Sequence, residues 1–144
     1  MKIRQAKPTD KERVMHLLGQ LNHPLGIDDN LFTEAFGQAL NEENHIILVA
    51  EEADYLVGYV SGYIHTALYA QRSVAHIDEI IIEEKNRRKG LGKELMKAIE
   101  ENLMQKGCIL ASLATVGAKD FYERLGYSGK ATYLKKPLPE KNEA

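Results

Sequence analysis

The N-terminal third of the chain combines apolar and polar residues at helical spacing. Its first apolar set is Val14, Leu17, Leu18 and Leu21. Intervals of three and four residues between these positions predict a helix over residues 10–21. Thr9 and Glu12 are spaced as a capping box, in which a hydroxyl and a carboxylate each bind a free amide of the first turn. A second helix is predicted over residues 31–40, and residues 1–6 can form a short strand.

The middle of the chain changes to patterns that are typical of strands. Residues 45–50 (HIILVA) form a compact apolar run, and residues 55–65 (YLVGYVSGYIH) are rich in β-branched and aromatic side chains. Residues 74–82 (VAHIDEIII) form a third run. Gly58 and Gly62 within the second run indicate bulges or points of close backbone approach. The short connections between these runs predict a largely antiparallel sheet.

The second half of the chain begins with its most regular helix, predicted over residues 90–105. Its mostly apolar stripe consists of Leu91, Leu95, Ala98 with Ile99, and Asn102 with Leu103. A buried strand is predicted over 108–114, a short helix over 118–125, and one or two final strands over 127–138. This order of elements predicts an α+β fold, with a single mixed, mostly antiparallel β-sheet flanked by helices on both faces.

Length and composition restrict the class of protein. The 144 residues fit one domain, and without a repeat or linker we expect that domain to cover residues 1–138, followed by a flexible tail at 139–144. Hydrophobic residues make up 44% and charged residues 28%, as in ordinary folded proteins. The net charge of −2 disfavours nucleic-acid binding, and no run approaches the ~18 apolar residues of a membrane helix. Cys108 is the single cysteine, so a reducing, cytoplasmic location is expected.

The segment Arg87-Arg88-Lys89-Gly90-Leu91-Gly92 joins the third apolar run to the regular helix. A helix N-terminus presents unpaired amides and a partial positive charge, and glycines let the backbone approach a ligand closely. Three consecutive cations raise the local potential further. The sequence therefore predicts an anion site here, suited to a phosphate or a pyrophosphate.

Two common phosphate motifs do not fit this segment. A P-loop requires Ser or Thr after its Gly-Lys pair, but Gly92-Lys93 is followed by Glu94. The dinucleotide fingerprint requires Gly or Ala at position 95, which is Leu.

The basic segment instead resembles the acyl-CoA signature of the GCN5-related N-acetyltransferase (GNAT) superfamily, Arg/Gln-x-x-Gly-x-Gly/Ala, with Arg87, Gly90 and Gly92 at its fixed positions. Residues 118–127 (AKDFYERLGY) resemble a second family segment, A-x-x-F-Y-x-x-x-G-[FY]. The resemblance covers nearly the whole chain and is that of a small bacterial-type, single-domain member. It implies the acyl-CoA N-acyltransferase fold and a cytoplasmic acyltransferase.

The resemblance also implies the reaction and the cosubstrate. An acetyl group would move from acetyl-CoA directly to a primary amine of a small molecule, with no metal. Backbone amides from 88 to 93 would hold the CoA pyrophosphate, and main-chain groups of Ile80 and Ile82 would pair with the pantetheine arm. Phe121 is either a contact of the cosubstrate or a residue of the hydrophobic core. The cofactor-binding residues so implied are Ile80, Ile81, Ile82, Arg87, Arg88, Lys89, Gly90, Leu91, Gly92, Lys93 and Phe121.

The same resemblance implies that Tyr122 donates a proton to the leaving thiolate. Asp78 and Glu79, on the strand before the basic segment, are the candidates for the base, which in this family acts on the amine through water or binds its cation. Adjacent strand residues point to opposite faces, so both reach one acceptor only if a bulge intervenes. We expect Glu79 to be the base and Asp78 to be second. An ion pair or a surface charge is the alternative role for both.

Several points stay open at this level. The family's Asn before the second segment is missing from residues 114–117 (ATVG). His76 and Asp78 lack a third metal ligand, and Cys108 is expected to be buried rather than a nucleophile. Negative charge toward a cationic acceptor is expected from Asp28, Asp29, Glu34 and Glu79.

The alternative functions are a CoA-binding sensor or partner module without catalysis, and acetylation of a protein N-terminus or lysine. Nucleic-acid and membrane partners are not expected. A homodimer is possible.

Overall fold

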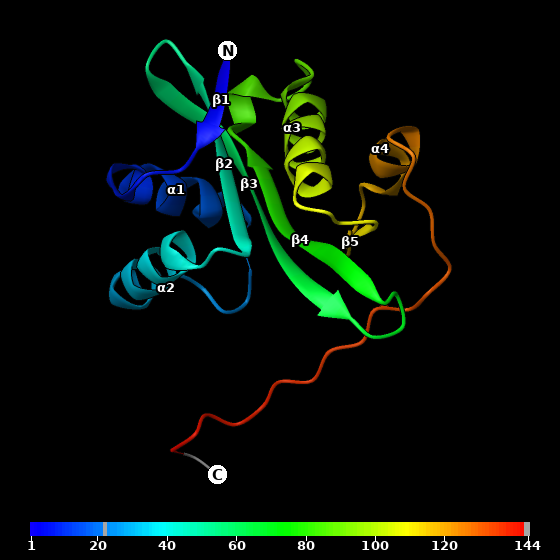
Figure 1. Cartoon of the computed structure of the whole chain (residues 1–144). Coiled ribbons are helices and arrows are strands. Elements are labelled where there is room, and N and C mark those ends of the chain that lie inside the picture. The colour runs from blue at the N-terminus through cyan, green and yellow to red at the C-terminus, as the bar shows by residue number, and fades with distance from the viewer. Residues whose placement is uncertain (22, 143–144) are drawn as a thin grey trace. The chain divides into compact units, whose positions relative to one another are not determined.

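The computed structural model of the chain describes residues 1–21 and 23–142 (Figure 1). Five strands form one sheet in the order β1-β2-β3-β4-β5, in which the first four strands are antiparallel and β5 is parallel to β4. The strands are β1 (Lys2–Gln5), β2 (His45–Glu52), β3 (Tyr55–Ala67), β4 (Arg72–Ile82) and β5 (Ala111–Leu113). The α-helices are α1 (Lys11–Leu18), α2 (Asp29–Asn41), α3 (Leu91–Gln105) and α4 (Lys119–Arg124). None of the described helices is long and apolar enough to cross a bilayer.

The contacts of the chain divide it into two units, residues 1–113 and 114–144. The sheet and α1 to α3 belong to the first unit, and α4 belongs to the second. A single domain over residues 1–138 stays a prediction. Of the predicted flexible tail, residues 139–142 are exposed, without helix or strand, and residues 143–144 lie outside the described part.

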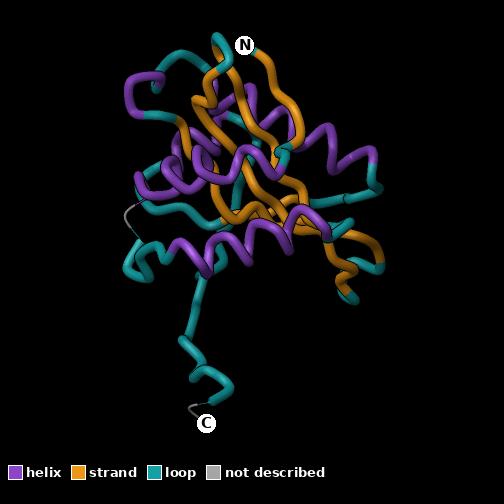
Figure 2. The backbone as a smooth tube through the Cα atoms, turned by 90° about the vertical axis from the view of Figure 1, so that its left-hand side faces the viewer, coloured by secondary structure: helices purple, strands orange, loops and turns teal. Residues whose placement is uncertain are grey.

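Helices cover both faces of the sheet in the first unit, as predicted from the element order. α1 and α2 lie on one face and α3 on the other (Figure 1), and Figure 2 shows α1 and α2 in front of the strands. The core under α1 and α2 consists of Val14, Leu17, Phe36, Ala39, Ile47, Val49, Leu56, Tyr59 and Ile81. Burial of these alternate strand positions explains why the apolar periodicity predicted this part of the fold.

Close approach of β4 and α3 accounts for both glycines of β3. A Cβ at Gly58 would lie 2.8 Å from Ile82 Cδ1 and 2.9 Å from the carbonyl oxygen of Ile81, both on β4, and 3.3 Å from Leu95 Cδ1 on α3. A Cβ at Gly62 would lie 3.1 Å from Ile99 Cδ1. The interpretation of these glycines as close-approach or bulge positions is confirmed.

A β-bulge interrupts the pairing of β3 with β4. Ser61 pairs with Glu79, but the next residue, Gly62, pairs with Ile77. Asp78 is therefore the extra residue on β4. A bulge changes which face successive side chains occupy, so it decides where the two acidic residues of this strand point.

Three predictions of local structure were wrong. Asp10 closes the short 3-10 turn before α1, Pro8–Asp10, by accepting the amide of Lys7 at 2.7 Å, and no side chain caps α1 itself, so the Thr9–Glu12 box is absent. Asp10 also binds Arg4 on β1, a partner that the local motif does not reveal. The strand after α3 covers only Ala111–Leu113, and Ile109 and Leu110 before it are 48% and 47% exposed rather than buried.

The third wrong prediction concerns the end of the chain. Residues 127–140 contain no strand. Apolar and β-branched residues suggested strands, but a strand also needs a partner edge, which composition does not reveal. Pro137 and Pro139 lack the N–H group that a ladder requires.

Candidate active site

The basic segment folds as a tight turn that ends at the start of α3. Arg88 and Gly90 both adopt the left-handed conformation, with φ of 66° and 81°. Glycine tolerates this conformation, whereas at Arg88 it costs about 1 kcal/mol or more in free energy. Backbone strain of this kind is often found at functional sites. No side chain caps the helix at Gly90, so the first-turn amides, starting at Leu91, remain available.

Exposed cations surround these amides. Arg87, Arg88, Lys89 and Lys93 are all exposed, whereas Leu91 is 5% exposed and anchors the helix in the core. Free amides, a helix N-terminus and several cations together can hold a diphosphate. The residues present therefore fit the anionic part of CoA.

The strand that leads into this turn has one edge without a partner strand in the part of the chain that the structure describes. β5 pairs with β4 only at Ala75, His76 and Ile77. The amide of Glu83 donates to the carbonyl oxygen of Val57 on β3 at 2.7 Å. Because the main-chain groups of successive strand residues point to alternate edges, this bond shows which residues of β4 face β3. Ile80 and Ile82 consequently turn their main-chain groups to the open edge, and Ile81 turns its own toward β3. The structure thus brings Ile80 and Ile82, but not Ile81, to the place where an extended arm can add to the sheet.

Arg13 of α1 binds the residue that precedes the basic turn and thereby stabilises the position of the turn. Its Nη2 donates to Glu83 Oε2 at 2.7 Å, its Nε donates to the carbonyl oxygen of Leu56 at 2.9 Å, and its guanidinium lies 4.1 Å from the ring centre of Tyr55. Gln20 also donates to Glu83 at 3.1 Å. Arg87 Nε donates to the carbonyl oxygen of Ile82 at 3.0 Å. These contacts hold the basic turn against β3, β4 and the end of α1.

The bulge brings Asp78 and Glu79 to one small cavity. This cavity, of about 140 Å³, lies between the sheet and helices α1 and α2. Its lining residues are Val14, Phe32, Ala35, Phe36, Ala39, His45, Ile47, Tyr59, Ser61, Asp78 and Glu79. Without the bulge, the side chains of these neighbouring residues would point to opposite faces of the sheet. The bulge that both need in order to reach one acceptor is therefore present.

Glu79 is the more perturbed carboxylate. Burial, assisted by the neighbouring charge of Asp78, raises the pKa of Glu79 to about 7. The Tyr59 hydroxyl donates to Glu79 Oε1 over a long 3.5 Å and opposes this shift only weakly. Burial also raises the pKa of Tyr59, which stays protonated. A carboxylate that titrates near neutral pH is suited to accept a proton from an amine.

Glu79 also faces a second, larger cavity. This cavity has a volume of about 490 Å³ and is formed mainly by the chain segment after α1. Its lining residues are Leu18, Gly19, Leu21, His23, Leu25, Gly26, Ile27 and Glu79. Glu79 is thus the residue that both cavities share.

The sequence did not single out the polar residues beside Glu79. His45 Nε2 lies 3.0 Å from Ser61 Oγ, and both line the smaller cavity together with Tyr59. Tyr59 and Ser61 are two positions apart in β3 and hence share a face. Polar side chains at alternate positions of this strand were the available signal.

The second unit contains Phe121 and Tyr122 on α4. Their rings meet edge to face with centroids 5.0 Å apart, and Tyr122 makes a similar contact with Tyr127 at 6.0 Å. Burial raises the pKa of Tyr122, which keeps its hydroxyl protonated at neutral pH. Both aromatic residues are half-buried.

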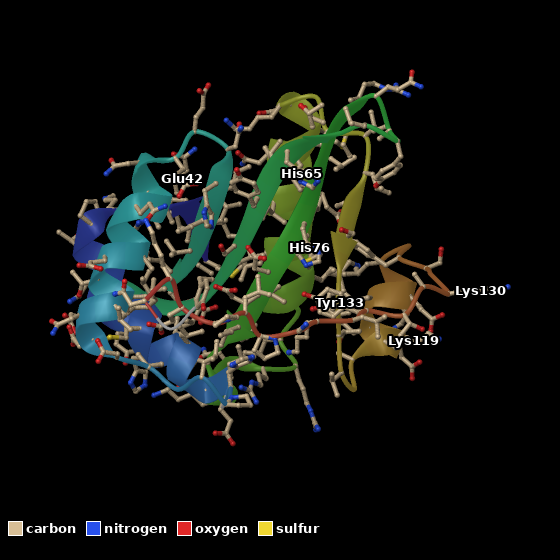
Figure 3. The ribbon with its side chains drawn as sticks, turned by 90° about the horizontal axis from the view of Figure 1, so that it is seen from below. Glu42, His65, His76, Lys119, Lys130 and Tyr133 are labelled. Atoms are coloured by element: carbon tan, nitrogen blue, oxygen red, sulfur yellow. The ribbon has the colours of Figure 1, made fainter. Side chains whose placement is uncertain are left out.

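The remaining candidates lie elsewhere. Asp28 caps α2 by accepting the amide of Leu31, and Asp29 binds Lys11. Neither of these residues, nor Glu34, is among the described residues that line the two cavities around Glu79. His76 lies on β4, on the strand next to His65 (Figure 3), with its Nδ1 3.0 Å from Ser112 Oγ.

No group of three metal-binding side chains occurs among the described residues. Cys108 is half-buried, and burial raises the pKa of its thiol, which disfavours a nucleophilic thiolate.

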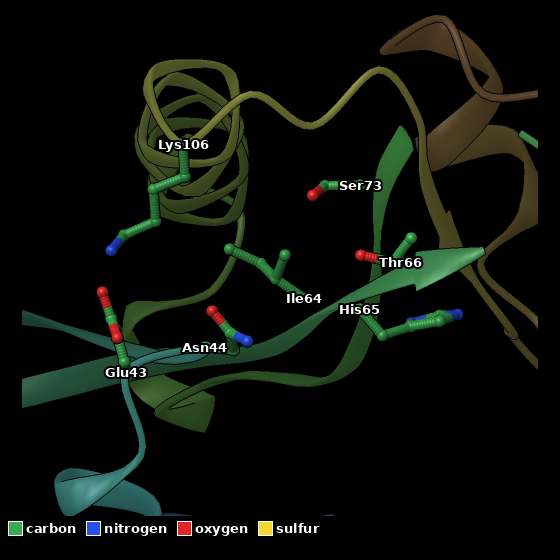
Figure 4. Close-up of a pocket in the computed structure, with 7 residues that line it drawn as sticks. All are labelled: Glu43, Asn44, Ile64, His65, Thr66, Ser73 and Lys106. Atoms are coloured by element: carbon green, nitrogen blue, oxygen red, sulfur yellow. The ribbon is translucent and has the colours of Figure 1, made fainter. Parts of the chain in front are cut away.

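A further cavity, of about 200 Å³, lies beside the C-terminal end of α3. Lys106 and Glu43 extend toward each other across it (Figure 4). It shares no described residue with the cavities around Glu79. We therefore do not include it in the candidate active site.

The fold is that of the acyl-CoA N-acyltransferases, as its solved structural neighbours show. The sequence profile of the Acetyltransferase (GNAT) family matches residues 13–127, and the chain belongs to this family. It is an acyltransferase that transfers an acetyl group to amines.

Three known proteins are similar to this chain over most of its length. Glucosamine 6-phosphate N-acetyltransferase from Arabidopsis thaliana is 28% identical over 94% of this chain and 95% of its own, and its crystal structure matches with a TM-score of 0.83. L-2,4-diaminobutyric acid acetyltransferase from Wolinella succinogenes is 28% identical over 91% of this chain and 75% of its own. A crystal structure described as a transcriptional regulator from Bacillus halodurans is 25% identical, with a TM-score of 0.84 over 95% of this chain and 99% of that one.

Proposed function

We propose that this enzyme transfers the acetyl group of acetyl-CoA directly to the primary amine of a small molecule in the cytoplasm. The observation that carries the proposal is the position of Glu79. This carboxylate has a pKa of about 7, lies at the β4 bulge, and faces two cavities. The open edge of β4 begins beside it.

Acetyl-CoA binding is assigned to the turn and the open edge. The free amides that begin at Leu91 would bind the pyrophosphate, and Arg88 and Lys89 would neutralise its charge. The outward main-chain groups of Ile80 and Ile82 would pair with the pantetheine amides, as in strand addition. Phe121 is proposed as an apolar contact of the cosubstrate.

In the proposed reaction, Glu79 accepts a proton from the ammonium group of the acceptor, directly or through water. The neutral amine then forms a bond with the acetyl carbonyl carbon, the carbon–sulfur bond to CoA breaks, and the proton that the acylated nitrogen loses restores the Tyr122 hydroxyl through water. Tyr122, protonated at neutral pH, supplies a proton to the leaving thiolate. Asp78 raises the proton affinity of Glu79 and is the second candidate for the base.

The test combines binding with turnover. Purified protein should bind CoA in calorimetry and release thiol from acetyl-CoA when amines are supplied. Glu79→Gln and Tyr122→Phe should both lose turnover and keep CoA binding. No CoA affinity and no thiol release with any amine would overturn the proposal.

The same experiments separate the alternatives. CoA binding without turnover would identify a sensor or partner module, and acetylation of peptides but not of small amines would identify a protein N-terminus or lysine as the acceptor. A homodimer and the absence of nucleic-acid and membrane partners stay predictions.

A further inference from the structure

We propose that the acceptor is an amine on an apolar chain or ring that carries no phosphate or carboxylate group. This inference rests on the proposed function and identifies the substrate class of the same site. Its basis is the kind of side chain that the two cavities around Glu79 present.

The charges that line these cavities have one sign. Asp78 and Glu79 are the acidic residues among the described lining residues, and none of those residues is Lys or Arg. An ammonium group is therefore attracted to the site. A phosphate or carboxylate on the same acceptor finds no Lys or Arg among these residues, and it meets the charge of Asp78.

The larger cavity has mainly apolar walls. Its described residues include Leu18, Leu21, Leu25 and Ile27. Leu25 is 89% exposed and Leu21 is 47% exposed, so their apolar surface is available to a ligand. A volume of about 490 Å³ is in the range of small-molecule sites, and such sites combine apolar walls with few polar groups.

One polar side chain in the larger cavity can orient the acceptor. His23 Nδ1 accepts the amide of Leu25 at 3.1 Å, which places the proton of the neutral ring on Nε2. His23 can therefore donate to a hydroxyl or a carbonyl oxygen of the acceptor. The smaller cavity adds the aromatic rings of Phe32 and Phe36.

This substrate class differs from those named for two relatives. Glucosamine 6-phosphate and L-2,4-diaminobutyric acid each carry an anionic group beside the amine. The described walls of the two cavities contain no Lys or Arg to pair with such a group. The inference thus predicts a specificity that family membership does not supply.

The experiment uses matched pairs of amines with and without the anionic group. The pairs are glucosamine and its 6-phosphate, 1,3-diaminopropane and L-2,4-diaminobutyrate, and phenethylamine and phenylalanine. Thiol release from acetyl-CoA is measured for each, with kcat/KM corrected for the fraction of neutral amine. We expect the member without the anionic group to be favoured by at least about tenfold in every pair that reacts.

Two variants test the cause of this preference. Leu25→Lys places a cation at the larger cavity and should reduce the ratio within each pair severalfold. Leu68→Lys is the matched control, because Leu68 is 90% exposed in the turn between β3 and β4 and lines none of these cavities. The control should leave the ratio unchanged.

The outcomes separate the two proposals. Preference for the anionic members, or a ratio that Leu25→Lys does not reduce, overturns the inference and leaves the acetyltransferase standing. No thiol release with any amine overturns the proposed function, and the inference with it.

Discussion

Two acidic residues of the first unit, the buried Asp10 and the half-buried Glu79, have opposite surroundings. Asp10, 7% exposed, receives two hydrogen bonds from Arg4, at 2.8 and 3.0 Å. The Arg4 guanidinium holds the pKa of Asp10 below its ordinary value, although burial acts against this effect. Glu79 has no cation among its described partners, and burial raises its pKa to about 7.

The comparison separates a structural acid from a candidate catalytic one. Arg4 also binds Glu51 at 2.6 Å, so this cluster joins β1, β2 and the start of α1. A paired carboxylate of this kind stays ionised and holds the fold. An unpaired carboxylate beside two cavities destabilises the fold slightly but can exchange a proton at neutral pH.

Removal of the Glu79 carboxylate should produce the largest effect. We expect Glu79→Gln to lower kcat/KM for the amine by about 100-fold or more, because a positioned base contributes roughly 10²–10⁴-fold. The CoA dissociation constant, measured by calorimetry, should change by less than about twofold. Asp78→Asn serves as the control and should cost less. Equal losses in the two variants would remove the distinction between Glu79 and Asp78.

Removal of the Arg4 side chain should act on stability instead. Arg4→Met leaves Asp10 buried without its cation, and we expect a loss of about 2–4 kcal/mol in the free energy of unfolding. Urea denaturation measures this loss, with Lys2→Met on the same strand as the exposed control. Turnover per folded molecule should be unchanged. A loss no greater than that of the control would show that this cluster is not structural.

The opposite pKa shifts predict opposite effects of pH on stability. Asp10 stabilises the fold above its unfolded pKa of about 3.9, and this contribution is lost as the pH falls through its lower folded pKa. Glu79 binds its proton more tightly in the folded state, so its contribution decreases as the pH rises from about 4.3 to about 7. Glu79→Gln should therefore stabilise the protein by about 1–2 kcal/mol above pH 7 and by little at pH 4. Equal unfolding midpoints for this variant and the wild type at pH 8 would contradict the raised pKa.

The smallest effect on activity is expected at Arg13, which stabilises the position of the basic turn through its contact with Glu83. Arg13→Lys keeps the charge but loses the hydrogen bond to Leu56 and the stacking on Tyr55. We expect the KM for acetyl-CoA to rise about 3- to 10-fold, with little change in kcat. Lys97→Gln, an exposed change on α3, is the control. A change in kcat alone would argue against a positioning role.

The sequence predicted those features that depend on neighbours along the chain. Apolar patterns located the helices and strands β2, β3 and β4, and the glycines of the basic turn located the start of α3. The bulge at Asp78 depends on the pairing of β3 with β4, which no local pattern contains. The pairing of Asp10 with Arg4 and the contact of Tyr59 with Glu79 likewise join separate segments. The prediction of strands over residues 127–138 was wrong because β-propensity does not identify the strand edge with which a segment could pair.

The pH dependence of kcat/KM for the wild type and Glu79→Gln tests the central claim most directly. We expect wild-type kcat/KM to rise through an inflection near pH 7, as Glu79 loses its proton, in addition to any rise from the amine. The inflection near pH 7 should be absent in Glu79→Gln, whose residual activity follows the ionisation of the amine alone. The same inflection in both proteins would contradict the assignment of Glu79 as the base.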